Sequence, residues 1–73
     1  MTKRLWGAPW CPACREAKKW LDNNNIEYVY ADVDDESNFD KVLELNIRGI
    51  PVLEEDGKIL IHGFSSEKYK QLL

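Results

Sequence analysis

Two cysteines separated by two residues lie between a short apolar segment and a helix-like segment, and this arrangement constrains the fold more than any other feature. Cys11 and Cys14 are the only cysteines of the chain. A pair with this spacing suits reversible disulfide chemistry, although the same spacing also occurs in metal sites. A metal site needs three or four ligands, and His62 is the only other soft ligand, so the sequence favours a redox-active dithiol.

The size and charge of the chain exclude several classes of protein. Its 73 residues are enough for a single domain, 1–73, with a small core. A net charge of −3 disfavours nucleic-acid binding. No run of 18 apolar residues is present, so we expect no membrane span. The N-terminus lacks the pattern of a signal peptide, which favours a cytoplasmic protein. We expect the protein to act as a monomer.

The first half of the chain has the pattern of a strand, a helix and a second strand. Residues 3–6 are apolar enough for a short strand, and residues 7–10 are expected to form the turn that follows. Pro12 suits the first position of a helix, and the residues at helical spacing behind it are apolar. Residues 26–33 have high β-propensity. A strand–helix–strand unit of this length predicts that its two strands are parallel.

The second half predicts a helix, a hairpin and a last short helix. An acidic stretch precedes a helix whose expected inner face is Phe39, Val42 and Leu43. An Asp-Gly turn joins two short strands, 51–54 and 58–61. The last helix is expected to turn Tyr69, Leu72 and Leu73 inward, with Ser65 as its N-cap. The predicted order is β-α-β-α-β-β-α, an α/β fold.

The position of Cys11 gives it a distinct chemistry. At a helix N-terminus, free backbone N–H groups and the positive end of the helix dipole stabilise a thiolate. The thiolate is the nucleophile in disulfide exchange. Cys14 lies one turn further on and faces the core, so we expect Cys11 to attack a substrate disulfide and Cys14 to resolve the mixed disulfide. Pro12 and Ala13, which lie between the two cysteines, are expected to set the reducing strength of the dithiol.

Three segments in register resemble the thioredoxin superfamily, and its glutaredoxin branch most closely. They are residues 10–14, 48–51 and 63–64. The resemblance implies a thioredoxin-like fold, with a four-stranded mixed sheet in the order 2-1-3-4 flanked by three helices. It implies a cis peptide bond before Pro51, beside the cysteines. It also implies no bound metal or organic cofactor, with glutathione, or thioredoxin reductase and NADPH, as the electron source.

The resemblance also identifies candidate substrate-binding residues. Arg48 matches a position that holds a glutathione carboxylate, and the backbone of Ile50 matches one that pairs with an extended peptide or glutathione. Gly63, Phe64 and Ser65 complete the implied binding segment. The chain has Leu5 where thioredoxins have a buried acid. The Gly63-Phe64 pair is similar to that of the NrdH-redoxins, the small glutaredoxin-like reductants of ribonucleotide reductase.

These observations predict a cytoplasmic reductase of protein disulfides, with ribonucleotide reductase as the leading candidate substrate. Two alternatives remain at this stage: a module that binds an iron–sulfur cluster with glutathione, and a thioredoxin-like partner subunit without turnover. Trp10 is interpreted as a docking surface, with packing against a neighbouring loop as the alternative. Phe64 fits the rim of a substrate groove and the core equally well. Trp6 and Trp20 are expected in the core, and His62 on the surface.

Overall fold

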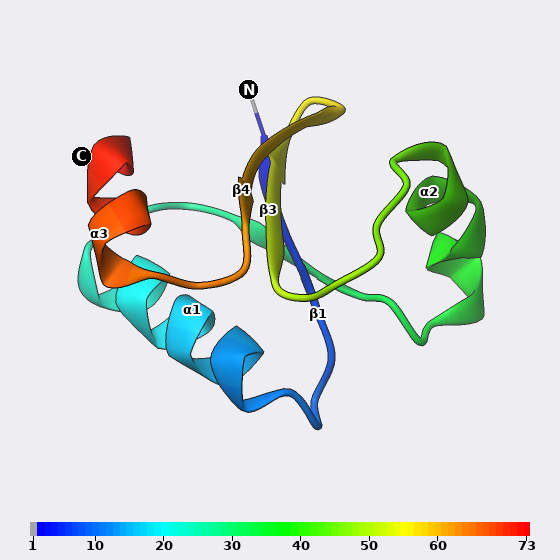
Figure 1. Cartoon of the computed structure of the whole chain (residues 1–73), viewed down its shortest axis with the longest axis horizontal. Helices are drawn as coiled ribbons and strands as arrows, with labels where there is room; N and C mark the ends of the chain where they lie inside the picture. Colours follow the sequence, from blue (N-terminus) through cyan, green and yellow to red (C-terminus); the bar gives the residue numbers. More distant parts are fainter. Residues whose placement is uncertain (1) are drawn as a thin grey trace.

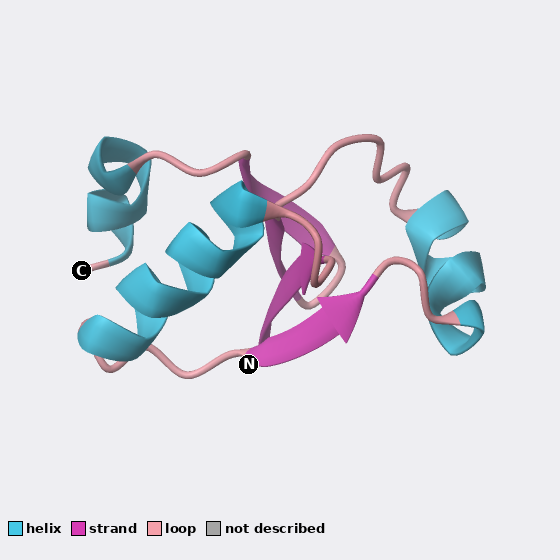
Figure 2. Cartoon of the chain, turned by 90° about the horizontal axis from the view of Figure 1, so that it is seen from below, coloured by secondary structure: helices cyan, strands magenta, loops and turns pink. Residues whose placement is uncertain are grey.

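The protein has three layers, with a β-sheet between helices on both of its faces (Figure 1). The computed structural model describes residues 2–73. Helices α1 (Pro12–Asn23) and α3 (Ser66–Tyr69) lie on one face of the sheet, and α2 (Phe39–Glu44) covers the other (Figure 2). Within the part of the chain that the structure describes, no helix combines the length and the apolar character required to cross a bilayer.

The sheet has four strands in the order β2-β1-β3-β4. Their bounds are β1 (Lys3–Gly7), β2 (Val29–Asp32), β3 (Val52–Glu55) and β4 (Lys58–His62). Strand β1 pairs with β2 in parallel and with β3 antiparallel, and β3 pairs with β4 antiparallel. The predicted strand order, the mixed sheet and the thioredoxin-like class are therefore confirmed.

Alternation along β1 supplies both faces of the sheet with apolar side chains. Leu5 is opposite Leu53, and both belong to the cluster that packs under α1 and α3. Trp6 is opposite Val52, and both belong to the cluster on the side of α2. Successive strand residues point to opposite faces, so two adjacent apolar residues serve two cores. The expected core position of Trp6 is confirmed, since its exposed fraction is 1%.

A carboxylate is buried beside the indole of Trp6. Glu54 is 3% exposed, and its side chain accepts a hydrogen bond from Trp6 Nε1 at 2.9 Å and another from the Gly57 backbone N–H at 2.7 Å. The guanidinium of Arg4 lies 3.6 Å from the same carboxylate. A buried charge is tolerated only when it is paired and hydrogen-bonded, and these contacts meet that condition.

The hairpin turn has the backbone that its residues require. Asp56 and Gly57 have φ angles of 51° and 90°, as expected for a two-residue turn with both central residues left-handed. Gly63 has a φ of 73° and follows directly on β4. The prediction that an Asp-Gly turn joins the two strands is confirmed.

Several expected boundaries and faces were wrong. The second strand begins only at Val29, and Gly7 is the last residue of β1 rather than the start of a turn. Of the predicted inner face of α2, Val42 does pack on the sheet, but Phe39 and Leu43 are 48% and 79% exposed, and Leu45, which follows the helix, packs there in their place. Leu73 is 75% exposed as well. Short 3₁₀ segments flank the small helices: η1 (Glu36–Asn38) before α2 and η2 (Lys70–Leu72) after α3.

Candidate active site around Cys11 and Cys14

Cys11 is the N-cap residue of α1. Its backbone is extended (φ −95°, ψ 109°), and its N–H donates to the carbonyl of Ala8 at 3.1 Å, which closes the turn after β1. Pro12 begins the helix, as predicted, where the lack of an N–H costs nothing. The Cys11 Sγ accepts a hydrogen bond from the backbone N–H of Cys14 at 3.1 Å. A sulfur in this position receives both the free N–H of the first turn and the positive end of the helix dipole.

Cys14 lies beneath Cys11 and is fully buried. Its exposed fraction is 0%, against 6% for Cys11, and both sulfurs are free thiols. Burial is the largest cause that raises the pKa of Cys14 from 9.0 to about 12, and the hydrogen bond and charge of Cys11 contribute to the same rise. A backbone hydrogen bond at Ala8 acts in the opposite direction. Near neutral pH the lower cysteine is therefore a protonated thiol in contact with the upper one.

The raised pKa of Cys14 predicts an alkaline loss of stability in the reduced protein. The folded state holds this proton more tightly than the unfolded chain, whose thiol has a pKa of 9.0. The contribution of this proton to the free energy of unfolding is complete below about pH 9 and is lost as the pH rises toward 12. Urea unfolding of the reduced protein across this interval should show a falling midpoint. Reduced Cys14→Ala retains Tyr28 and Tyr69, whose pKa values burial also raises to about 12, so its midpoint should fall less steeply. If the urea midpoint fell with pH equally steeply in the wild type and in Cys14→Ala, the prediction would be contradicted.

Side chains on both sides of Cys11 hold the loop in which it lies. Trp10 is 65% exposed, and its Nε1 donates to Asp34 Oδ2 at 2.8 Å. Arg15 folds back from α1, where its guanidinium donates to the Pro9 carbonyl at 2.9 Å. Trp10 therefore presents a ring to solvent beside the cysteines and is tethered at its edge to the segment after β2.

The segment before β3 approaches the cysteines from the other side. The Ile50–Pro51 peptide bond is cis, as the resemblance implied. Ile50 packs against the cluster formed by Ala8 and the two cysteines. The carbonyl of Pro51 accepts a hydrogen bond from the Gly63 N–H at 2.8 Å, which brings the segment after β4 alongside.

A shallow groove of about 270 Å³ runs from Trp10 along this segment. Arg48 is exposed, and its Nε donates to Asn46 Oδ1 at 3.2 Å. The groove is lined mainly by apolar side chains with Arg48 at its border. The lining residues are Trp10, Val33, Val42, Ile47, Arg48, Gly49 and Ile50.

The other predicted binding residues lie elsewhere. Phe64 packs edge-on against Tyr69, with the ring centroids 4.9 Å apart, and lines a separate groove beside α1. Ser65 is the N-cap residue of α3, as expected, but within residues 2–73 its side chain makes no capping hydrogen bond. His62 is exposed. Of the implied binding residues, the structure gathers Arg48 and Ile50 along the groove and places Gly63 against Pro51.

Sequence reasoning missed two residues that border the buried thiol. A Cβ placed on Gly7 would lie 3.0 Å from Cys14 Sγ and 2.9 Å from the hydroxyl oxygen of Tyr30. A glycine in a strand often marks such a close approach, and this was the available signal. In the described residues no group of three or more His, Cys, Asp or Glu side chains is arranged to hold a metal ion.

Comparison with known proteins identifies relatives of this arrangement. The family model described as Glutaredoxin matches residues 1–60. A glutaredoxin-like 8.6 kDa protein encoded in the rubredoxin operon of Clostridium pasteurianum is 31% identical over 72 residues, which cover 96% of this chain and 95% of that protein. The glutaredoxin-like protein NrdH of Lactococcus lactis subsp. cremoris is 34% identical over 47 residues, or 63% of this chain and 65% of NrdH.

Solved structures agree with these relatives. The crystal structure of the thioredoxin-like protein BC3987 has a TM-score of 0.82 and 31% identity, and the match covers 99% of this chain and 100% of that one. The glutaredoxin of Archaeoglobus fulgidus has a TM-score of 0.76 at 22% identity, over 96% of this chain and 83% of that one, and so supports the fold. The chain belongs to the glutaredoxin family of the thioredoxin superfamily.

Proposed function

We propose that the protein is a thiol–disulfide oxidoreductase that reduces disulfide bonds in other proteins through Cys11 and Cys14. Proteins of the glutaredoxin family are in general thiol oxidoreductases and bind no cofactor of their own. The observation that carries the proposal is the 3.1 Å contact between Cys11 Sγ and the Cys14 backbone N–H at the start of α1. The backbone N–H and the positive end of the helix dipole therefore face the sulfur that acts as the nucleophile in the first exchange.

The arrangement supports two successive exchange steps. The Cys11 thiolate attacks one sulfur of a substrate disulfide, and the other substrate sulfur leaves as a thiolate and takes a proton from water. Cys14 then loses its proton and attacks Cys11 Sγ, which releases the second substrate thiol and leaves a Cys11–Cys14 disulfide. The substrate gains two electrons, and an external reductant returns the protein to the dithiol. Burial of Cys14 keeps it a thiol until the first step is complete.

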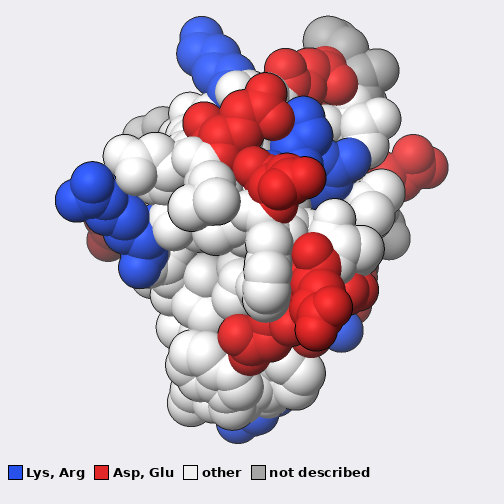
Figure 3. Space-filling model, turned by 90° about the vertical axis from the view of Figure 1, so that its right-hand side faces the viewer, with Lys and Arg blue, Asp and Glu red and all other residues white. Residues whose placement is uncertain are grey.

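The surface next to Cys11 suits an extended segment of a protein substrate. We propose that Trp10 and Ile50 contact this segment and that Pro51, which has no N–H, leaves the Ile50 backbone free to pair with it. The face covered by α2 carries more acidic than basic side chains (Figure 3). An excess of acidic side chains disfavours the binding of polyanions at this face.

We propose ribonucleotide reductase as the leading substrate, thioredoxin reductase with NADPH as the leading electron source, and the cytoplasm as the site of action. The similarity to NrdH and the resemblance to the NrdH-redoxins support this choice. Glutathione is the second candidate, and exposed Arg48 at the border of the groove favours it, because a guanidinium pairs with a carboxylate in bidentate geometry.

Two coupled assays test the proposal. Both follow NADPH oxidation in the presence of insulin as a disulfide substrate, one with thioredoxin reductase and the other with glutathione and glutathione reductase. We expect turnover with thioredoxin reductase to exceed that with glutathione. The reverse order would assign glutathione as the reductant. Inactivity with both electron sources would overturn the reductase proposal.

A further inference from the structure

The second exchange step requires Cys14 to lose its proton, and the raised pKa of this buried thiol opposes that loss. Burial and Cys11 raise the pKa of Cys14, and a hydrogen bond with the backbone of Ala8 lowers it. No carboxylate acts on Cys14 among the described residues. The resolving step nevertheless requires a thiolate at this buried position. A neutral hydrogen-bond donor beside the sulfur is one way to stabilise that thiolate.

The hydroxyl of Tyr30 and the sulfur of Cys14 border the same space beside Gly7, and no hydrogen bond joins them in the dithiol. A Cβ on Gly7 would lie 2.9 Å from Tyr30 Oη and 3.0 Å from Cys14 Sγ, so both atoms border the same small space beside the β1 backbone. Tyr30 is opposite Leu5 in the parallel register of β1 and β2, and this register directs its ring toward α1. The closeness depends on a glycine at position 7, because any side chain there would separate the two polar atoms.

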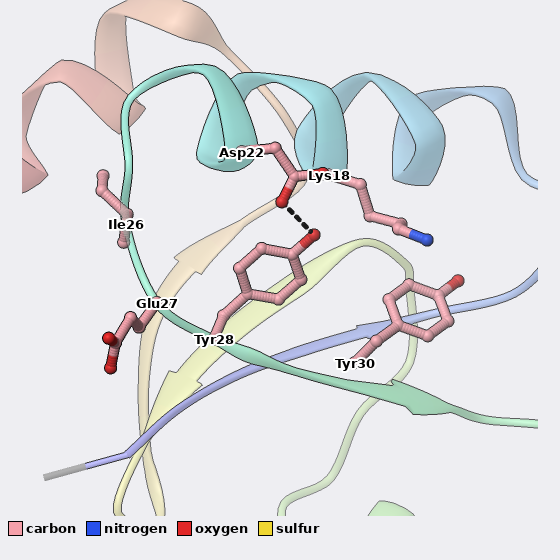
Figure 4. Close-up of a pocket in the computed structure, with 6 residues that line it drawn as sticks. All are labelled: Lys18, Asp22, Ile26, Glu27, Tyr28 and Tyr30. Carbon is pink, nitrogen blue, oxygen red and sulfur yellow. Dashed lines mark hydrogen bonds between the residues drawn. The ribbon is translucent and has the colours of Figure 1, made fainter.

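Tyr30 also lies at the wall of a solvent-open pocket of about 500 Å³ between α1 and the edge strand β2 (Figure 4). The ammonium group of Lys18 is 4.8 Å from the centroid of its ring. Tyr28 enters the same pocket, but its hydroxyl donates to Asp22 Oδ1 at 2.9 Å. The Tyr28 hydroxyl is thus bonded to a carboxylate, whereas the Tyr30 hydroxyl borders the same space as the buried thiol of Cys14.

We propose that the Tyr30 hydroxyl donates a hydrogen bond to the Cys14 thiolate as it forms and thereby accelerates the second exchange step; the inference rests on the proposed function. Cys14 loses its proton to water, and its thiolate attacks Cys11 Sγ. The Cys11–Cys14 bond forms as the bond to the substrate sulfur breaks. The substrate sulfur leaves with the electron pair and takes a proton from water. Tyr30 keeps its own proton throughout.

The ionisation of Tyr30 is compatible with this role. Burial raises its pKa above 10.0, and the charges of Cys14, Asp32 and Cys11 raise it further, so the phenol remains protonated near neutral pH. Tyr69 on α3 also lies in the field of Cys14, and its buried hydroxyl has no hydrogen-bond partner among residues 2–73. The charged and titratable groups that face Cys14 or Tyr30 are thus Cys11, Lys18, Asp32 and Tyr69.

Stopped-flow reaction with 5,5′-dithiobis(2-nitrobenzoate) separates the two steps. Attack by Cys11 releases one coloured thiolate at a rate that depends on reagent concentration. Attack by Cys14 on the resulting mixed disulfide releases a second at a rate that does not. We expect Tyr30→Phe to slow the second phase at least about tenfold, since a hydrogen bond to a charged group is worth that factor or more. The first phase should be unchanged.

Tyr28→Phe is the matched control, because it removes a hydroxyl from the same pocket, one residue before β2, and that hydroxyl is bonded to Asp22 instead. It should leave both phases unchanged. The pH profile of the second phase should move to higher pH in Tyr30→Phe and remain in place in the control. Tyr30→Met provides a second variant without the hydroxyl, and thermal unfolding of all three variants establishes that they are folded.

The outcomes distinguish this inference from the proposed function. Two phases in the wild type with an unchanged second phase in both Tyr30 variants would overturn the role of Tyr30 and leave the reductase proposal standing. A slower second phase in Tyr69→Phe but not in Tyr30→Phe would also overturn it, in favour of the other tyrosine. Release of a single equivalent by the wild type would contradict the two-cysteine mechanism itself.

Discussion

Cys11→Ser is expected to lower the reduction of protein disulfides roughly a thousandfold or more, to the rate of the uncatalysed reaction. A serine hydroxyl is not a nucleophile toward disulfides near neutral pH, so the first exchange cannot begin. The fold should be retained, since serine is among the best N-cap residues and its hydroxyl oxygen can accept the Cys14 N–H that the sulfur accepts. Insulin reduction and thermal unfolding, measured on the same sample, check both statements.

Cys14→Ser is the control that separates the two sulfurs. Its first exchange should proceed, and the mixed disulfide with the substrate should accumulate, because no resolving thiol remains. Intact mass after reaction with a disulfide reagent should show one adduct on Cys14→Ser and none on Cys11→Ser. Adducts on Cys11→Ser, or insulin reduction at more than a few per cent of the wild-type rate, would show that Cys11 is not the attacking group.

The dithiol and its helix followed from local sequence. Pro12 at the first helical position and the apolar spacing of Cys14, Ala17 and Leu21 are properties of one short segment, and all three of these side chains are fully buried. The Asp-Gly turn is equally local, because aspartate tolerates the left-handed backbone and glycine, without a Cβ, adopts it freely. The strand order rested on the family resemblance, which covers nearly the whole chain.

Features that depend on distant contacts could not be predicted in the same way. Phe39 and Leu43 fit an apolar helix face, but the orientation of α2 is fixed by the cluster around Trp6 and Val52 on a sheet formed by other segments. Glu54 has the sequence context of an ordinary strand carboxylate, and its burial depends on an indole donor 48 residues away. The pairing of Tyr30 with the site likewise requires the parallel register of β1 and β2.

Gly7→Ala is expected to destabilise the protein by about 1–3 kcal/mol, which is the usual effect of an extra methyl group in a filled core. The added Cβ would lie 3.0 Å from both the Cβ and the Sγ of Cys14, and 2.9 Å from Tyr30 Oη. The Cys14 Cβ is fixed to the backbone of α1, so relief requires the helix to move from the sheet. Urea unfolding of the reduced protein measures the loss.

The matched control is Gly49→Ala, where an added Cβ meets no atom within 4 Å. Removing a glycine from the unfolded ensemble stabilises a protein by about 0.4–1 kcal/mol when the native backbone accepts alanine, so this variant should be unchanged or slightly more stable. The two substitutions are chemically the same and are expected to differ in sign. In Gly7→Ala the second exchange phase should also slow, because the methyl group enters the space between Tyr30 and Cys14. Equal stability of the two variants would mean that α1 is not packed against β1 at Gly7 as closely as the structure has it, and the contact on which the role of Tyr30 depends would be lost with it.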